Sequence, residues 1–232
     1  MLQEEVIDVD ATHPVTFQLK NATVVGDITV PENARALIVF AHGSGSSRHS
    51  PRNKKVAQFL QEAGFATLLM DLLTPSEEIE DQITARLRFN IPLLAERLVL
   101  ATEHLKQQPQ FKKMVIGYFG ASTGAAAALQ AAAMQPESIY AVVSRGGRPD
   151  LAGILLSKVQ APTLLIVGGL DTIVIELNES AQQQLQALSQ LEIVPGATHL
   201  FEEPGTLDRV SQLACAWFKK YLPIAPQDAK LA

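Results

Sequence analysis

Along the chain, apolar residues first alternate with polar ones and later form unbroken runs. The alternation over residues 4–30, clearest at Val15–Leu19 and Val25–Val30, predicts antiparallel strands at the edge of a sheet. Beyond residue 35 the apolar runs are continuous, which is typical of strands that helices cover on both faces. These runs predict strands at 36–41, 65–70, 114–119, 139–144, 163–167 and 191–194.

Between these runs, apolar residues recur at helical spacing. The spacing predicts helices at 51–63, 81–107, 125–134, 151–158, 177–188 and 207–221, with a break or kink at Pro92 and a polar loop at Thr74–Glu78. Antiparallel strands followed by alternating strands and helices predict an α/β fold with a mostly parallel, doubly wound sheet. We expect residues 1–232 to form a single domain, with its functional residues at the carboxyl ends of the strands.

One strand leads into the pattern Gly-x-Ser-x-Gly, here Gly120-Ala121-Ser122-Thr123-Gly124, and an alanine-rich helix follows. A turn this tight strains its apex residue, and glycines on both sides avoid collisions with neighbouring strands. The first N–H groups of the helix have no partner inside it and carry the positive end of its dipole. The stretch predicts Ser122 as a nucleophile with an oxyanion donor beside it, the alternative being an ordinary glycine turn before a buried alanine helix.

His199 is the histidine best placed to act as the base for Ser122. It follows the last predicted strand, at the sheet edge where the serine turn lies. An imidazole that acts as a general base needs a carboxylate on its other nitrogen, and Asp171, which follows the preceding strand, is the candidate. The order Ser122, Asp171, His199 is the one expected of this turn. As alternatives, Asp171 could cap the helix that starts at Thr172, Asp71 competes for its role, and His199 could be a loop histidine without chemistry.

The second oxyanion donor is expected in the segment His42–Ser47, which follows the first continuously apolar strand. Its two glycines allow backbone N–H groups to approach a substrate oxygen closely. We predict that the N–H groups of Ser44 and Thr123 form the oxyanion hole, and that His42 orients the loop by hydrogen bonding. A plain turn or a phosphate cradle is the alternative, although the Gly-Lys-Ser/Thr ending of a P-loop is missing.

Arginines border the proposed site and are candidates for binding a substrate carboxylate. Arg48 follows the oxyanion segment, and Arg145 stands at the carboxyl end of a strand, where its guanidinium could hold a carboxylate through two hydrogen bonds. Pairing of Arg145 with Asp150 or with another acid is the alternative.

Composition restricts the classes of partner. Nineteen Lys and Arg residues against 24 Asp and Glu give a net charge of −5, and no basic stripe with aromatic residues is present, so no nucleic acid partner is expected. No apolar run reaches the ~20 residues that cross a bilayer, and Met1–Val6 lacks the features of a signal peptide, which predicts a cytoplasmic protein without a membrane partner. The single cysteine, Cys215, is expected to be buried. The pattern gives no indication of oligomeric state.

These motifs resemble those of the α/β-hydrolases and, within them, of dienelactone hydrolase-like proteins. The resemblance rests on His42-Gly43-Ser44-Gly45, Gly120–Gly124, Gly169-Leu170-Asp171 and Ala197-Thr198-His199. It implies an α/β-hydrolase fold, although dienelactone hydrolases use a cysteine nucleophile where this chain has Ser122. The connection between the strands ending at Ser144 and beginning at Thr163 is too short for a large lid domain. We therefore expect an open site covered by loops such as 72–80.

Together these residues predict a serine hydrolase that cleaves a carboxylic ester or a lactone of a small molecule. The reaction would proceed through a Ser-His-Asp triad and an acyl-enzyme, and it requires neither a metal nor an organic cofactor. Two alternatives use the same residues. One is an acyltransferase, and the other is a non-catalytic protein that binds a ligand within the hydrolase fold.

Overall fold

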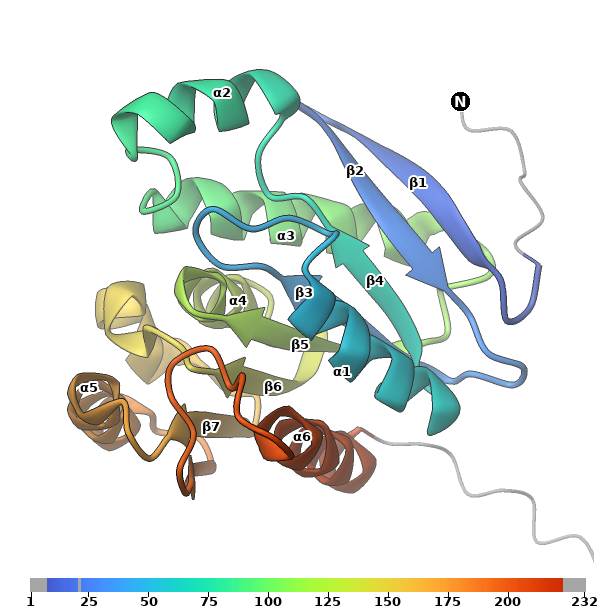
Figure 1. The fold of residues 1–232 in the computed structure, drawn as a ribbon. Helices are drawn as coiled ribbons and strands as arrows, with labels where there is room; N and C mark the ends of the chain where they lie inside the picture. Colours follow the sequence, from blue (N-terminus) through green and yellow to red (C-terminus); the bar gives the residue numbers. More distant parts are fainter. Residues whose placement is uncertain (1–7, 21, 223–232) are drawn as a thin grey trace, which may run out of the picture.

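The computed structural model describes residues 8–20 and 22–222, which build an eight-stranded sheet (Figure 1). The strands lie in the order β1-β2-β4-β3-β5-β6-β7-β8. β2 pairs antiparallel with β1 and β4, and all other neighbours are parallel. The predicted fold class, a mostly parallel sheet with N-terminal antiparallel strands, is therefore confirmed. The strands are β1 (Thr12–Leu19), β2 (Ala22–Thr29), β3 (Ala36–Ala41), β4 (Ala66–Met70), β5 (Val115–Ala121), β6 (Ile139–Arg145), β7 (Thr163–Gly168) and β8 (Ser189–Val194).

Helices cover both faces of this sheet. α1 and α6 pack on one face, whereas α3, α4, η1 and α5 pack on the other (Figure 1). Most alanines of α4, among them Ala126 and Ala128, are fully buried, because small side chains let this helix lie close to the sheet. The helices are α1 (Pro51–Glu62), α2 (Pro75–Thr84), α3 (Ile91–Gln107), α4 (Thr123–Met134), the 3₁₀ helix η1 (Pro149–Lys158), α5 (Thr172–Gln184) and α6 (Thr206–Tyr221).

The carboxyl ends of the parallel strands meet at one edge of the sheet. The register aligns Ala41 of β3 with Gly120 of β5, and Ala121 of β5 with Arg145 of β6. The loops that follow β3, β5, β6 and β7 therefore open onto the same edge, which is where parallel sheets of this kind bind their ligands.

The predicted polar loop at Thr74–Glu78 is wrong, because these residues begin helix α2. The Thr74 hydroxyl accepts the N–H of Glu77, and the Glu77 carboxylate accepts the N–H of Thr74. This reciprocal pair is a capping box, and Pro75 in the first turn fits a helix start because its missing N–H would have no helical partner.

The single helix predicted over residues 81–107 is also wrong. α2 ends at Thr84, the next residue is left-handed with a φ of 53°, and α3 begins only at Ile91. Pro92 lies in the first turn of α3, so it starts a helix instead of kinking one. The Asp81 carboxylate accepts two backbone N–H groups from the connecting turn and so holds the chain in its reversal.

Other boundaries differ less from the predictions. The short helix predicted at 151–158 is a 3₁₀ helix interrupted by Gly153, and α5 begins at Thr172, earlier than predicted. η1 is the element between β6 and β7, so no large lid is present there. The predictions at residues 4–7 and Asn21 lie outside the described residues. Within 8–20 and 22–222, no helix is long and apolar enough to span a membrane.

Candidate active site

Ser122 lies at the apex of the tight turn between β5 and α4. Its backbone has φ 51° and ψ −122°, a strained conformation for a residue with a side chain. A Cβ atom added to Gly120 would lie 2.4 Å from Ala125 Cα, and one added to Gly124 would lie 2.3 Å from the carbonyl oxygen of Ala41. The two flanking glycines are thus the residues that let this turn pack against the end of β3, as the pattern predicts.

Asp171 and His199 are joined directly. His199 Nδ1 lies 2.6 Å from Asp171 Oδ2, and this hydrogen bond fixes the tautomer with the proton on Nδ1 and leaves Nε2 able to accept one. Asp171 is the N-cap residue of α5, but its side chain makes no capping hydrogen bond. The competing carboxylate, Asp71, instead accepts hydrogen bonds from the backbone and guanidinium of Arg48. Of the two acids, the structure therefore places Asp171 against the histidine.

One segment of backbone, residues 145–148, supports both Ser122 and His199. The N–H of Ser122 donates to the carbonyl of Arg145 at 3.2 Å, and the N–H of Arg148 donates to the carbonyl of Ser122 at 3.1 Å. A Cβ added to Gly146 would lie 3.7 Å from His199 Cε1. No hydrogen bond joins the Ser122 hydroxyl to His199 in the part of the chain that is described, as is common before substrate binds. The His199 side chain is 40% exposed, so an incoming molecule can reach it.

The segment after β3 packs directly against the serine turn. A Cβ added to Gly43 would lie 2.9 Å from Ser122 Cβ, and the hydroxyls of Ser44 and Thr123 are 3.0 Å apart. Among the described hydrogen bonds, none uses the backbone N–H of Ser44 or that of Thr123. Two neighbouring donors without protein partners are what an oxyanion hole requires.

His42 is a fixed, neutral member of this segment. Its Nε2 accepts the N–H of Leu72 at 3.0 Å, so its Nδ1 carries the proton and donates to the carbonyl of Gly43 at 2.9 Å. Burial lowers the pKa of His42 below its ordinary value of 6.5. These two hydrogen bonds agree with the predicted role of orienting the loop.

The burial of neutral His42 makes stability depend on pH. Because its pKa is lower in the folded state than in the unfolded state, the unfolded state takes up the proton first as the pH falls. Stability is complete above about 6.5 and declines below it, by at most about 1.4 kcal/mol per pH unit for one proton. We expect urea unfolding between pH 7.5 and 5 to show a shallower decline for His42→Gln than for the wild type, whereas the exposed control His49→Gln keeps the wild-type slope. Equal slopes in all three proteins would contradict this account.

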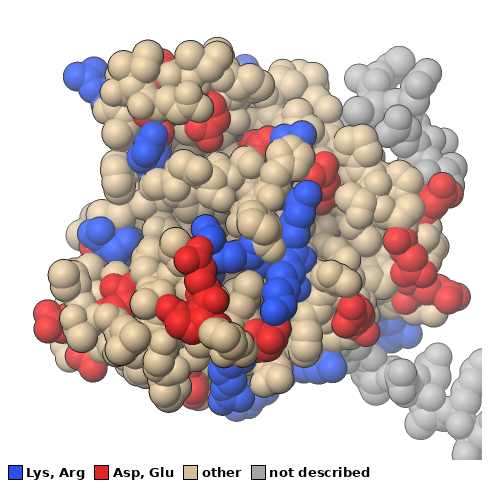
Figure 2. Space-filling view, viewed as in Figure 1, with Lys and Arg blue, Asp and Glu red and all other residues tan. Residues whose placement is uncertain are grey.

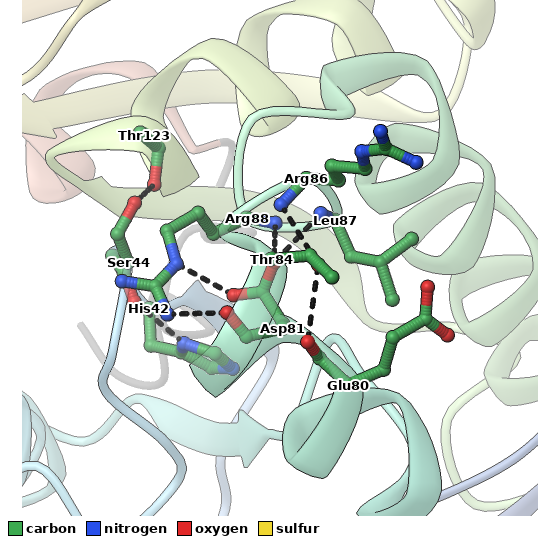
Figure 3. Close-up of polar contacts among 10 residues, drawn as sticks. His42, Ser44, Glu80, Asp81, Thr84, Arg86, Leu87, Arg88 and Thr123 are labelled. Atoms are coloured by element: carbon green, nitrogen blue, oxygen red, sulfur yellow. Dashed lines mark hydrogen bonds and ion pairs between the residues drawn. The ribbon is translucent and has the colours of Figure 1, made fainter.

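A small cavity adjoins the predicted oxyanion donors. Figure 3 shows several of the side chains that line it, among them His42, Ser44 and Arg88. Three leucines from the chain around α2 and α3 give it an apolar wall, and charged side chains give it a polar one. Arg88 lies between Ser44 and Asp81 in the close-up, and its guanidinium donates to the fully buried Asp81 carboxylate at 2.6 Å. The cavity is lined by His42, Gly43, Ser44, Gly45, Leu72, Leu73, Glu78, Asp81, Arg88, Leu94 and Thr123.

The sequence interpretation missed the charged side chains of this cavity. It predicted that loops such as 72–80 cover the site, and three residues of this segment do line the cavity: Leu72 and Leu73 before α2, and Glu78 on the helix itself. The signal was present in the Thr-Pro-Ser-Glu sequence that opens α2, because a capping box fixes where a helix starts and hence which side chains face inward.

The two arginines predicted to bind substrate have protein partners. Arg48 forms ion pairs with Asp71 and Asp27, and so ties the loop after β3 to the antiparallel part of the sheet. Arg145 is only 6% exposed, and the acid that it was expected to meet, Asp150, pairs with Arg148 instead. A carboxylate clamp needs an accessible guanidinium, so the geometry does not favour this role for Arg145.

Other chemistry-bearing residues lie apart from this site. Cys215 is buried on α6, as predicted. Among residues 8–20 and 22–222, no group of three or more His, Cys, Asp or Glu side chains could hold a metal ion.

Similarity to known proteins extends over nearly the whole chain. Residues 23–222 match the family model of the dienelactone hydrolase family. The crystal structure of a dienelactone hydrolase from Anabaena variabilis is similar with a TM-score of 0.89 and 55% identity, over 91% of this chain and 98% of that one. A dienelactone hydrolase-like promiscuous phosphotriesterase from metagenomic libraries shares the fold, with a TM-score of 0.72 and 18% identity over 91% of this chain and 98% of that chain.

A curated relative from Mycobacterium tuberculosis is longer than this chain. It is named as a proposed phosphoribosyl transferase and is 60% identical over 199 residues, which are 86% of this chain but 44% of that protein. The chain thus spans less than half the length of this relative. Family model, fold and sequence identity agree: this chain belongs to the dienelactone hydrolase family of α/β-hydrolases.

Proposed function

We propose that this protein is a serine hydrolase that cleaves a carboxylic ester or a lactone of a small molecule through an acyl-enzyme. The observation that carries the proposal is the 2.6 Å hydrogen bond between His199 and Asp171, at the same sheet edge as the strained turn of Ser122. An oriented base at the same sheet edge as a half-buried serine is the arrangement from which nucleophilic acyl transfer can proceed.

In the first half of the reaction, His199 Nε2 takes the proton of Ser122 as the serine oxygen attacks the ester carbonyl. Asp171 stabilises the imidazolium that forms, because its carboxylate accepts the Nδ1 proton. The carbonyl oxygen becomes negatively charged, and the N–H groups of Ser44 and Thr123 are the donors that we assign to it. Thr123 is the first residue of α4, so the positive end of the helix dipole adds to this stabilisation.

In the second half, the tetrahedral intermediate collapses and the bond to the alcohol breaks. The leaving alcohol takes the proton from His199, and the acyl group stays on Ser122. Water then enters, gives a proton to His199 and attacks the acyl carbon. Collapse of this second intermediate returns the proton to Ser122 and releases the acid, so no metal or organic cofactor is consumed.

The small cavity beside Ser44 offers both apolar and polar contacts next to the proposed oxyanion donors. Leu72, Leu73 and Leu94 offer apolar contacts, whereas Glu78 and Arg88 are charged. Burial and the nearby carboxylate of Asp81 raise the pKa of Glu78. More than half of the M. tuberculosis relative lies outside the match, so the activity in its name has no counterpart in the residues that carry this proposal.

Trapping of the acyl-enzyme tests this function. The protein is mixed with p-nitrophenyl acetate, quenched with acid within the first turnovers, and measured by intact mass and peptide mapping. We expect one acetyl group on Ser122 and steady release of acetate into water. The same assay with a small lactone examines the second substrate class.

The two alternatives predict different results in this assay. An acyltransferase would hold the acetyl group on Ser122 and release it mainly when an alcohol acceptor is added. A binding protein would form no adduct at Ser122 while remaining folded. Either outcome would overturn the proposal of a hydrolase that uses water.

A further inference from the structure

Arg145 is a buried cation that has no acid beside it. Within the described residues, no carboxylate lies within 4 Å of its guanidinium, which donates to the neutral Asn53 Oδ1 at 3.1 Å. Burial, with a smaller effect of Arg52, lowers the pKa of Arg145 to about 10, so the side chain still carries its charge at neutral pH. Burying an unpaired charge is costly, and an apolar side chain would fill the same volume without that cost. The charged guanidinium of Arg145 is therefore expected to have a role beyond packing.

The guanidinium of Arg145 also contacts the ring of Phe201, two residues after His199. The guanidinium carbon lies 5.9 Å from the centre of this ring, within the range of a cation–π interaction. Phe201 has a φ of 56°, which residues with a side chain rarely adopt, and its ring is buried. Surrounding contacts must hold such a conformation in place, and Arg145 supplies one of them.

Contacts from α1 and from within the loop fix the rest of this segment. Arg52 of α1 forms an ion pair with Glu202, and Glu203 accepts hydrogen bonds from the backbone and hydroxyl of Thr198. Basic and acidic side chains lie against one another on the face seen in Figure 2. Lys55 of α1 also pairs with Asp208. The Arg52 pair is exposed and contributes little, whereas the contact with Arg145 is buried.

The backbone of Arg145 contacts the other half of the predicted triad. Its carbonyl accepts the N–H of Ser122 at 3.2 Å, and the next residue, Gly146, packs against the backbone and ring of His199. Arg145 thus holds the nucleophile through its main chain and the histidine loop through its side chain.

From this double contact we infer that Arg145 is a positioning residue that sets the place of His199 relative to Ser122. The guanidinium is held in one orientation by Asn53, and the ring of Phe201 rests against it. Through that ring, the loop that carries His199 keeps its place at the serine. This inference rests on the proposed function, since it assigns Arg145 a part in the same reaction.

Two variants of Arg145 test this role against a matched control. Arg145→Met keeps the apolar stem without the charge, Arg145→Lys keeps the charge, and Arg209→Met removes an exposed arginine from α6. We expect Arg145→Met to lower kcat for p-nitrophenyl acetate, and the rate of fluorophosphonate labelling of Ser122, by about 100-fold, because a displacement of about 1 Å has that effect. KM should change less than about threefold, since substrate contacts remain. The kcat and labelling rate of Arg145→Lys should be about tenfold higher than those of Arg145→Met, because the cation is kept. Arg209→Met should match the wild type.

Hydrogen exchange gives a readout that does not depend on catalysis. We expect amide exchange at residues 198–203 to rise in Arg145→Met, while exchange in α3 stays at the wild-type rate. Unchanged labelling together with unchanged exchange would overturn the inference. If Arg145→Met does not fold, Phe201→Leu replaces it in the test, because this variant removes the ring and keeps the cation. A wild-type rate of Ser122 labelling in Phe201→Leu would also overturn the inference. If the wild type neither reacts with the fluorophosphonate nor hydrolyses esters, the proposed function fails. The role of Arg145 in holding the loop is then decided by hydrogen exchange at residues 198–203.

Discussion

Replacement of Ser122 by alanine is expected to lower kcat/KM for ester hydrolysis by at least ~10³-fold, which corresponds to a barrier higher by at least about 4 kcal/mol. The oxygen that attacks the carbonyl is lost, and no acyl-enzyme can form. The fold should be unaffected, because alanine has the same Cβ as serine and so adds no strain at a φ of 51°. Rates from initial velocities and stability from thermal unfolding are measured on the same preparations.

Ser157→Ala is the matched control for this change. Ser157 is exposed on η1, and its hydroxyl donates only to the carbonyl of Ile154, so its removal should leave the rate within about twofold of the wild type. If purified Ser122→Ala hydrolysed the ester as fast as the wild type, Ser122 would not be the nucleophile.

Replacement of Asp171 by asparagine is expected to lower kcat by about 10³- to 10⁴-fold with little change in KM. The amide nitrogen of asparagine would donate a hydrogen bond to His199 Nδ1, so the imidazole would carry its proton on Nε2 instead. A histidine in that tautomer cannot take the proton of Ser122. Stopped-flow or steady-state assays of ester hydrolysis measure the loss, and peptide mapping should show slower acylation of Ser122.

Asp208→Asn provides the comparison for Asp171→Asn. Asp208 is 53% exposed and pairs with Lys55 at the surface, so its loss should not alter the rate. An equal loss in both variants would point to a general effect of charge, and an active Asp171→Asn protein would contradict the assigned role of Asp171.

The sheet and the pair formed by Asp171 and His199 were predictable from the sequence, for a physical reason. Parallel strands buried on both faces form continuous apolar runs, and the carboxyl ends of such strands lie at the same edge. Polar residues directly after those runs, among them Ser122, are therefore brought to one place. The flanking glycines added a steric argument, and distances to Ala41 and Ala125 agree with it.

The helices around the cavity were harder to predict, because their boundaries depend on single hydrogen bonds. Hydrophobic spacing continues from α2 into α3, and nothing in that spacing reveals that the Asp81 carboxylate binds the turn between them. A capping box at Thr74 is visible in the sequence, but polar residues at a helix start resemble a loop. Apolar periodicity therefore does not predict helix boundaries that side-chain hydrogen bonds determine.

The partners of the arginines could not be predicted for a related reason. Arg145, Arg148 and Asp150 lie within six residues of one another, so sequence distance does not decide which arginine meets the acid. Strand β6 ends at Arg145 and turns its side chain into the layer under α1, towards Asn53. Arg148 remains in the loop and meets Asp150 there. Side-chain direction at the end of a strand is a property of the folded sheet.

The central claim is that Ser122 is a nucleophile activated by His199, and labelling with a fluorophosphonate tests it most directly. The probe reacts with serines that a neighbouring base deprotonates, so it needs no knowledge of the natural substrate. We expect a single adduct, mapped to Ser122 by mass spectrometry, that is lost in His199→Ala. A folded wild-type protein that takes up no probe, or equal labelling with and without the imidazole of His199, would contradict the account.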